Sequence, residues 1–317
     1  MKLIFLLLFS FPALAVDVGP NDILKIKGYE GSVNLITHNL KTVEAQYQVK
    51  NQSNVPWTVR SYKDKNKVVI EVVPPANKAI WQKSNQSNPQ FALTVKAPSM
   101  PTEIYWQKGK VHSKGRQNSL KITALNVDLR IEDHKGDVSV FNNQGQIVLK
   151  DVVGDLDIES YSATTQINAT KGELKLNNFS GNMQLVSHKG SANLKSSRGK
   201  VLTRSGEGKV EFEGKMAQFN FNQQKGSIRG KSDIGAVNIN SNKDLEVSVR
   251  SDKAPIILDL KNSGAWVNLG TKEGNISAAS YLKTKRYSTL KVIMGRLRGS
   301  QSGKVFVRTK TGDIILK

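Results

Sequence analysis

The sequence predicts an all-β protein, a parallel β-solenoid of the β-roll or β-helix type. Two observations predict this fold: glycine recurs every nine residues through the middle of the chain, and apolar residues follow these positions at fixed places. A third observation is consistent with this fold class. The chain has 317 residues and no cysteine, so a large core rather than disulfides has to stabilise it.

Glycine marks the turns of the predicted repeat. Between residues 136 and 235 a nine-residue spacing defines twelve positions, of which ten are glycine and the other two are Ala163 and Ala217. The ten glycines are Gly136, Gly145, Gly154, Gly172, Gly181, Gly190, Gly199, Gly208, Gly226 and Gly235. Because glycine adopts backbone conformations that a side chain forbids, we expect a turn at each position.

Apolar residues keep the same spacing. Two places after these positions lie Val138, Ile147, Leu156, Leu174, Met183, Val201, Val210, Phe219, Ile228 and Val237, and four places after lie Val140, Leu149, Ile158, Ile167, Leu176, Leu185, Leu194, Phe212, Phe221 and Ile239. The sixth place is mostly small or polar. Each nine-residue unit therefore predicts a short strand with one buried face, followed by a turn. The spacing extends back to Gly109 and, after an interruption at 281–287, returns at Gly303 and Gly312.

Lysine spacing favours a coil with two sides over a coil with three. The residue before the repeat position is lysine at Lys135, Lys171, Lys189, Lys225 and Lys243, and the gaps between these lysines are all multiples of eighteen. Two chemically different turns therefore alternate along the chain, which predicts two-sided coils of 18 residues.

Residues 1–15 have the pattern of a secretory signal peptide. Lys2 precedes an apolar run at 3–11, and a small-x-small pattern ends at Ala15. The run is shorter than the about 20 residues that span a bilayer, and no later apolar stretch reaches that length. We expect a mature chain that begins at Val16 and is exported to the periplasm, the cell surface or the extracellular space.

The rest of the chain divides into two predicted parts. Residues 16–99 are rich in β-type segments but lack the nine-residue spacing. They predict either irregular first coils of the solenoid or a small capping β-domain, since a solenoid needs a cap over its terminal sheet edge. Residues 100–317 are expected to form the β-solenoid repeat domain.

The chain is strongly basic. It has 47 Lys and Arg residues against 26 Asp and Glu residues, a formal net charge of +21. Such an excess favours anionic partners, and export disfavours nucleic acid as that partner. The expected partners are an anionic envelope polymer, lipopolysaccharide or an acidic glycan. The alternative is that lysine only keeps exposed strand edges soluble and unpaired.

Two groups of cations are the candidate polyanion-binding residues. One is the lysine ladder of Lys135, Lys171, Lys189, Lys225 and Lys243. The other is a basic C-terminal region with Lys283, Lys285, Arg286, Arg296 and Arg298, where Asp313 is the single acidic residue between positions 283 and 317. The alternative for the second group is a solvated rim that prevents end-to-end stacking.

No residues predict a catalytic, cofactor or metal site. The four histidines lack the close spacing of zinc ligands, and no cysteine is available to join them. Asp137, Asp155 and Glu173 recur every eighteen residues, and we expect neighbouring lysines to neutralise them as a salt-bridge ladder rather than a bound metal ion. Asp155 and Asp157 with Lys175 could imitate a polysaccharide lyase, a less favoured alternative.

The repeats resemble the putative adhesin family of bacterial envelope proteins, also known as domain of unknown function 4097. The matching segments are the entry at Leu93-Thr94-Val95-Lys96-Ala97-Pro98 and units such as Gly136-Asp137-Val138-Ser139-Val140 and Gly312-Asp313-Ile314-Ile315-Leu316. The resemblance covers about residues 93–317. It implies a β-solenoid and supplies no catalytic residues.

The predicted function is non-catalytic binding of an anionic envelope polymer or surface, in the manner of an adhesin, through spaced Lys and Arg side chains. The rival is a structural envelope scaffold that acts by self-association or by association with a partner protein.

Overall fold

The computed structural model describes residues 14–50, 57–74, 90–260, 264–300 and 302–317. Residues 1–13, which make up most of the predicted signal peptide, lie outside this range, whereas Leu14 and Ala15 belong to the first strand, β1 (Leu14–Asp17). Every regular element in the described residues is a β-strand, and most strand pairs are parallel. The prediction of an all-β, solenoid-like fold is therefore confirmed. None of the described residues forms a helix that is long and apolar enough to cross a membrane.

The chain divides into two compact units, residues 1–130 and residues 131–317. The strands of unit 1 are β1, β2 (Ile23–Thr37), β3 (Thr42–Lys50), β4 (Thr58–Asp64), β5 (Lys67–Val73), β6 (Gln90–Ala97) and β7 (Thr102–Lys114), while β8 (Leu120–Lys135) contains the boundary. β2 pairs in parallel with β5, β6 and β7, whereas β1 and β6 pair with β3 and β4 pairs with β5 in antiparallel fashion. Unit 1 is therefore a mixed sheet. It includes β7, which lies after residue 100, the predicted start of the repeat domain.

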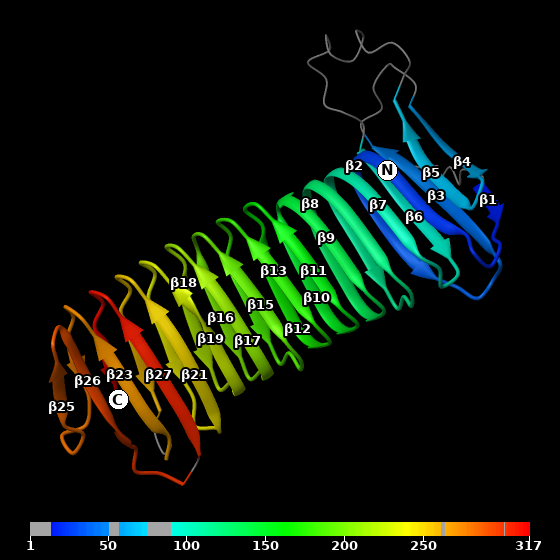
Figure 1. Cartoon of the computed structure of the whole chain (residues 1–317). Coiled ribbons are helices and arrows are strands. Elements are labelled where there is room, and N and C mark those ends of the chain that lie inside the picture. The colour runs from blue at the N-terminus through cyan, green and yellow to red at the C-terminus, as the bar shows by residue number, and fades with distance from the viewer. Residues whose placement is uncertain (1–13, 51–56, 75–89, 261–263, 301) are drawn as a thin grey trace, which may run out of the picture. The chain divides into compact units, whose positions relative to one another are not determined.

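Unit 2 consists mainly of two alternating series of short strands. The first series is β9 (Val138–Gln144), β11 (Leu156–Ser160), β13 (Leu174–Asn178), β15 (Ala192–Ser196), β17 (Glu207–Gly214), β19 (Lys225–Ser232) and β21 (Leu245–Ser251). The second is β10 (Gln146–Val153), β12 (Thr164–Lys171), β14 (Met183–Val186), β16 (Lys200–Arg204), β18 (Gln218–Asn222), β20 (Val237–Asn240) and β22 (Ile256–Asp259). Each strand pairs in parallel with the next member of its own series, as Figure 1 shows for the green and yellow strands.

The strand register places like residues on like residues. Leu156 pairs with Leu174, and Ile158 pairs with Leu176, so paired residues lie eighteen positions apart in the chain. Leu156 and Ile158 are buried, whereas Asp157 between them is exposed. Alternation along each strand therefore sends the predicted apolar positions into a continuous core, where each Leu or Ile side chain contributes about 1.5–3 kcal/mol.

The two kinds of turn have different requirements. At Gly154 the backbone has φ +146°, and a Cβ atom added there would lie 2.2 Å from the carbonyl oxygen of Gly136. Only glycine fits this turn. In the other turn the side chains of Ser196, Ser232 and Ser251 are buried, and each donates its hydroxyl to a backbone carbonyl two or three residues later. These hydrogen bonds explain why a small polar residue is the last residue of each of these strands.

The last repeat does not occupy the last place in the sheet. The remaining strands are β23 (Trp266–Thr271), β24 (Ile276–Ser277), β25 (Thr284–Tyr287), β26 (Leu290–Arg296), β27 (Gly303–Thr309) and β28 (Ile314–Leu316). β27 pairs in parallel with both β21 and β23, and β28 pairs with both β22 and β24. β26 then pairs antiparallel with β23, and β25 pairs with β26. The order at this end is thus β21, β27, β23, β26, β25 (Figure 1).

Candidate polyanion-binding surface

Three of the predicted ladder lysines lie in one column, which an acidic residue interrupts. Lys171 pairs with Lys189, Lys189 pairs with Glu207, and Glu207 pairs with Lys225. Lys225 Nζ lies 3.1 Å from Glu207 Oε1, and this hydrogen bond, together with the positive charge of Lys225, lowers the pKa of Glu207. The carboxylate partly neutralises the column. A glutamate directly before Gly208, on the same eighteen-residue spacing as the lysines, is the sequence signal for this interruption.

The other two ladder lysines are separated from that column. Val153 pairs with Lys171, so an apolar side chain occupies the coil between Lys135 and Lys171. After β19 the register shifts by one residue, because Gly226 pairs with Leu245, and this shift displaces Lys243 from Lys225. The ladder is therefore shorter and less uniform than its spacing in the sequence suggests. Binding by these lysines stays a prediction.

Two of the three stacked acidic residues accept hydrogen bonds from backbone N–H groups. Asp155 N donates to Asp137 Oδ1 at 3.0 Å, and Glu173 N donates to Asp155 Oδ1 at 2.9 Å. Within the described part of the chain, none of these three carboxylates has a Lys or Arg nitrogen within 4.0 Å. The expectation of a salt-bridge ladder is wrong here, because Asp137 and Asp155 each accept the backbone N–H group of the next coil.

The predicted C-terminal cations lie on and around the terminal hairpin formed by β25 and β26. All five are exposed: Lys283, Lys285, Arg286, Arg296 and Arg298. The Arg298 guanidinium lies 4.5 Å from the centroid of the Tyr281 ring, a cation–π distance, and Arg296 Nε donates to the carbonyl oxygen of Gly264. Among the residues that the structure describes, no carboxylate lies within ion-pair distance of these five cations.

A second row of cations crosses three neighbouring strands. Lys231 on β19 pairs with Arg250 on β21, which in turn pairs with Arg308 on β27. Neighbouring strands lie about 4.8 Å apart, so three positive side chains follow one another at that spacing. Glu213 neutralises Lys231 from the far side, at 2.9 Å. Arg250, in the middle, has no carboxylate within 4.0 Å among the described side chains.

Arg308 is fixed in place by its neighbours. Its Nη1 donates to the Asn268 carbonyl oxygen at 2.9 Å, its Nη2 donates to Asn268 Oδ1 at 2.7 Å, and its guanidinium carbon lies 4.1 Å from the Phe306 ring centroid. Burial and the nearby charge of Arg250 lower the pKa of Arg308. Arg308 nevertheless stays charged at neutral pH, because an arginine pKa begins far above that range.

A shallow hollow lies beside this row. It has a volume of about 250 Å³, and its lining includes Arg229 from β19, Glu246 and Ser248 from β21, and Lys304 and Phe306 from β27. Two cations and one carboxylate thus face a space large enough for a phosphate or a carboxylate group. We call the set of Arg229, Lys231, Arg250, Lys304 and Arg308 the basic row, and it is the candidate anion-binding surface.

None of the five residues of the basic row is among the candidate residues predicted from the sequence to bind polyanions, although Lys304 and Arg308 lie within the basic C-terminal region. One signal that could have pointed to them is the uneven distribution of charge along the repeats. Residues 131–180 contain 4 basic and 8 acidic residues, whereas residues 181–317 contain 25 basic and 10 acidic residues. The cationic surface therefore belongs to the C-terminal coils rather than to the whole repeat region.

A larger hollow in unit 1, of about 460 Å³, is less suited to anions because its charges are already paired. Lys25 lies 3.8 Å from Glu103, and Lys27 lies 3.5 Å from Glu71. Tyr105 also lines this hollow, and burial together with the charge of Glu103 raises the pKa of its hydroxyl. These groups form two separate ion pairs, and the Tyr105 hydroxyl donates to Glu103 in one of them.

Two of the residues considered for lyase-like chemistry are neighbours on the sheet. Asp157 and Lys175 occupy paired, exposed positions on β11 and β13, and Asp155 accepts a backbone hydrogen bond. Within the described ranges, no three His, Asp or Glu side chains gather in a way that could hold a metal ion.

No family model matches the chain, and no curated protein matches it. Two solved structures are similar in part. One is a putative cell adhesion protein from Clostridium sporogenes, with 11% identity, a TM-score of 0.21 and coverage of 96% of this chain and 98% of that chain. The other is a putative lipid binding protein from Parabacteroides distasonis, with 11% identity, a TM-score of 0.33 and coverage of 96% of both chains. TM-scores this low carry no argument about fold or function.

Proposed function

We propose that this protein is an exported, non-catalytic β-solenoid that attaches to an anionic component of the cell envelope through Lys and Arg side chains on unit 2. The observation that carries the proposal is the basic row, where Lys231, Arg250 and Arg308 stand on consecutive strands. Stacked like charges repel each other in the free protein. A bound polyanion would relieve this repulsion, since each of its charges could lie between two cations.

The repeating coil makes the spacing of these charges regular. In this proposal the repeat is an 18-residue, two-sided coil, which is supported by the pairing of Leu156 with Leu174 and of Val201 with Phe219. Parallel strands hold equivalent side chains about 4.8 Å apart. A polymer or surface with closely spaced phosphate or carboxylate groups fits such a row better than a single small anion does.

Salt-dependent binding of the purified mature chain to polyphosphate and to an acidic polysaccharide tests the proposal. The variant Arg250→Gln should weaken binding about fivefold, the equivalent of ~1 kcal/mol for one exposed charge. Arg204→Gln is the matched control, because Arg204 is exposed on β16, in the other series of strands, and its loss changes the net charge equally. Equal effects of the two variants, or affinities that do not change between low and high salt, would contradict the proposal.

The scaffold alternative is favoured by exposed apolar side chains at one kind of turn in unit 2. The rings of Tyr161 and Phe179 are stacked with centroids 4.9 Å apart, and Met216 and Ile234 are exposed two and three coils further on, beyond a coil whose turn carries Arg198. A scaffold would self-associate or bind a partner protein through such side chains. Sedimentation analysis separates the two functions, because a salt-insensitive oligomer without polyanion binding would support the scaffold.

A further inference from the structure

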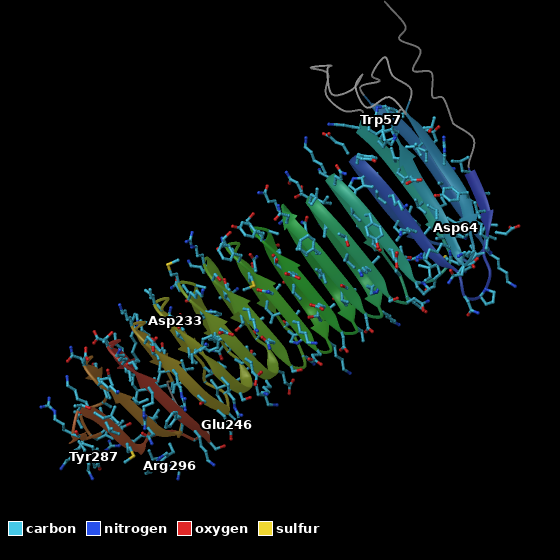
Figure 2. The ribbon with its side chains drawn as sticks, turned by 45° about the horizontal axis from the view of Figure 1, so that its top comes forward. Trp57, Asp64, Asp233, Glu246, Tyr287 and Arg296 are labelled. Carbon is cyan, nitrogen blue, oxygen red and sulfur yellow. The ribbon has the colours of Figure 1, made fainter. Side chains whose placement is uncertain are left out.

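The outer face of the terminal sheet combines exposed apolar side chains with cations. On β23, Trp266 has 54% of its surface exposed. It is paired with Arg296 on β26 and with Lys304 on β27, so the indole lies between two positive side chains. Figure 2 shows Arg296 and Tyr287 at this same end of unit 2.

The next row of the same face has apolar side chains on both sides of Asn268. Met294 on β26 has 45% of its surface exposed, and it pairs with Asn268 on β23, which pairs with Phe306 on β27. The Arg308 guanidinium covers the Phe306 ring. Tyr281 and Tyr287 add two exposed rings in the segment around β25. Apolar and cationic side chains therefore alternate across this face.

The strands of this face contain no acidic residue. β23, β25, β26 and β27 carry no Asp or Glu, whereas they contain Lys285, Arg286, Lys291, Arg296, Lys304 and Arg308. Arg286 pairs with Lys291, and Lys291 pairs with the buried Thr271, so these two cations lie on the other side of the sheet from Trp266. We call the outer surface that carries Trp266, Met294, Arg296, Lys304, Phe306 and Arg308 the terminal face.

The combination discriminates between kinds of anionic partner. A soluble polyphosphate or acidic glycan would satisfy the cations but would leave Trp266 and Met294 in water. An anionic bilayer offers both environments, because its head groups attract Lys and Arg while the interfacial layer accepts indole and thioether groups. Trp is enriched at that depth of a membrane for the same reason.

We propose that the terminal face docks on the surface of an anionic lipid bilayer, with Trp266 entering the head-group layer between Arg296 and Lys304 and Met294 entering it in the next row, on the strand that carries Arg296. This inference rests on the proposed function for the basic character of the surface, and it names the component as lipid. The basic row, which shares Lys304 and Arg308 with the terminal face, would lie against phosphate groups of the same bilayer surface. Docking of this kind is peripheral and reversible.

The test is co-sedimentation of the mature chain with vesicles of phosphatidylcholine alone or mixed with phosphatidylglycerol, in parallel with binding of soluble polyphosphate. Trp266→Ser should weaken binding to the anionic vesicles about tenfold, since about half of an indole surface loses its apolar environment. The same variant should leave polyphosphate affinity within about twofold of the wild-type value. Ile234→Ser is the matched control, because Ile234 is 56% exposed but lies in the turn between β19 and β20.

Tryptophan fluorescence gives a second readout, which reports the environment of the indole rather than the dissociation constant. Anionic vesicles should shift the tryptophan emission of the wild-type chain to shorter wavelength, and Trp266→Phe should remove this shift while retaining most of the binding.

The outcomes separate the inference from the function on which it rests. If the wild-type chain binds polyphosphate but not anionic vesicles, or if Trp266→Ser and Ile234→Ser affect vesicle binding equally, the lipid inference is overturned and the proposed function stands. An equal loss of polyphosphate and vesicle binding in Trp266→Ser also overturns it. If neither probe binds, the proposed function fails.

Discussion

The turn glycine at position 154 provides a sharp test of how the repeats stack. Gly154 has φ +146°, and an alanine Cβ there would lie 2.2 Å from the Gly136 carbonyl oxygen of the preceding coil. The backbone conformation alone costs an alanine about 1–3 kcal/mol. The coils would also have to separate by roughly 1 Å to relieve the contact, since close packing leaves no adjacent space. Gly154→Ala should therefore destabilise unit 2 by about 3 kcal/mol or more.

Urea denaturation followed by circular dichroism measures this loss. Gly270→Ala serves as the control, because Gly270 lies in strand β23 without a positive φ and its added Cβ would meet side-chain atoms of Arg308 at 3.1 Å rather than backbone, so that this side chain has to shift by only a few tenths of an ångström. Alanine is also the better residue in a strand by about 0.5–1 kcal/mol, so the control should change stability by less than about 1 kcal/mol. Equal unfolding midpoints for the two variants would refute the stacking geometry inferred at this turn.

Three further predictions concern a buried cation, a buried histidine and the interrupted lysine column. Arg116 is buried and donates hydrogen bonds to the carbonyl oxygens of Ala97, Pro98 and Met100 and to Thr102 Oγ1, and burial lowers its pKa to about 10. Arg116→Met should destabilise unit 1 by about 3 kcal/mol in thermal unfolding, since it removes four hydrogen bonds that the buried guanidinium donates; a loss under about 1 kcal/mol would contradict this. His188 bonds Thr170 Oγ1 at 2.9 Å, and burial lowers the His188 pKa below its ordinary 6.5, so stability should be complete above about pH 6.5 and fall as the pH drops through the folded-state pKa. His188→Gln should flatten that part of the pH profile, and an unchanged profile would rule out the histidine as its source. Glu207→Gln should strengthen polyphosphate binding, because it removes the carboxylate that pairs with Lys225, and the direction would be wrong if Glu207→Gln bound more weakly than the wild-type chain in the same titration.

The candidate site was only partly predictable from the sequence. The lysine spacing correctly placed Lys171, Lys189 and Lys225 in one column, because residues eighteen apart pair on neighbouring strands. The same spacing also contains Glu207, which changes the charge of that column. The C-terminal cations were visible as a dense basic segment, but their neighbours on the sheet were not.

Local patterns determined most of the architecture of unit 2. Alternation of apolar and polar residues decides which side chains of a strand are buried, as with Leu156 and Asp157, and this alternation depends only on the geometry of the strand itself. Gly154 likewise marks a turn whose backbone angles exclude other residues. Such information lies within a few consecutive residues, so the sequence by itself determined an all-β chain of repeated strands.

Only the tertiary structure decided the order of the last strands. β27 comes after β23 in the chain but lies between β21 and β23 in the sheet, which places Arg308 beside Arg250 and Lys304 beside Trp266. Strand pairing is a contact between residues far apart in sequence, and backbone hydrogen bonds are the same for any pair of neighbours. No local period therefore encodes which strand will be adjacent, and the basic row and the terminal face arise from that long-range pairing.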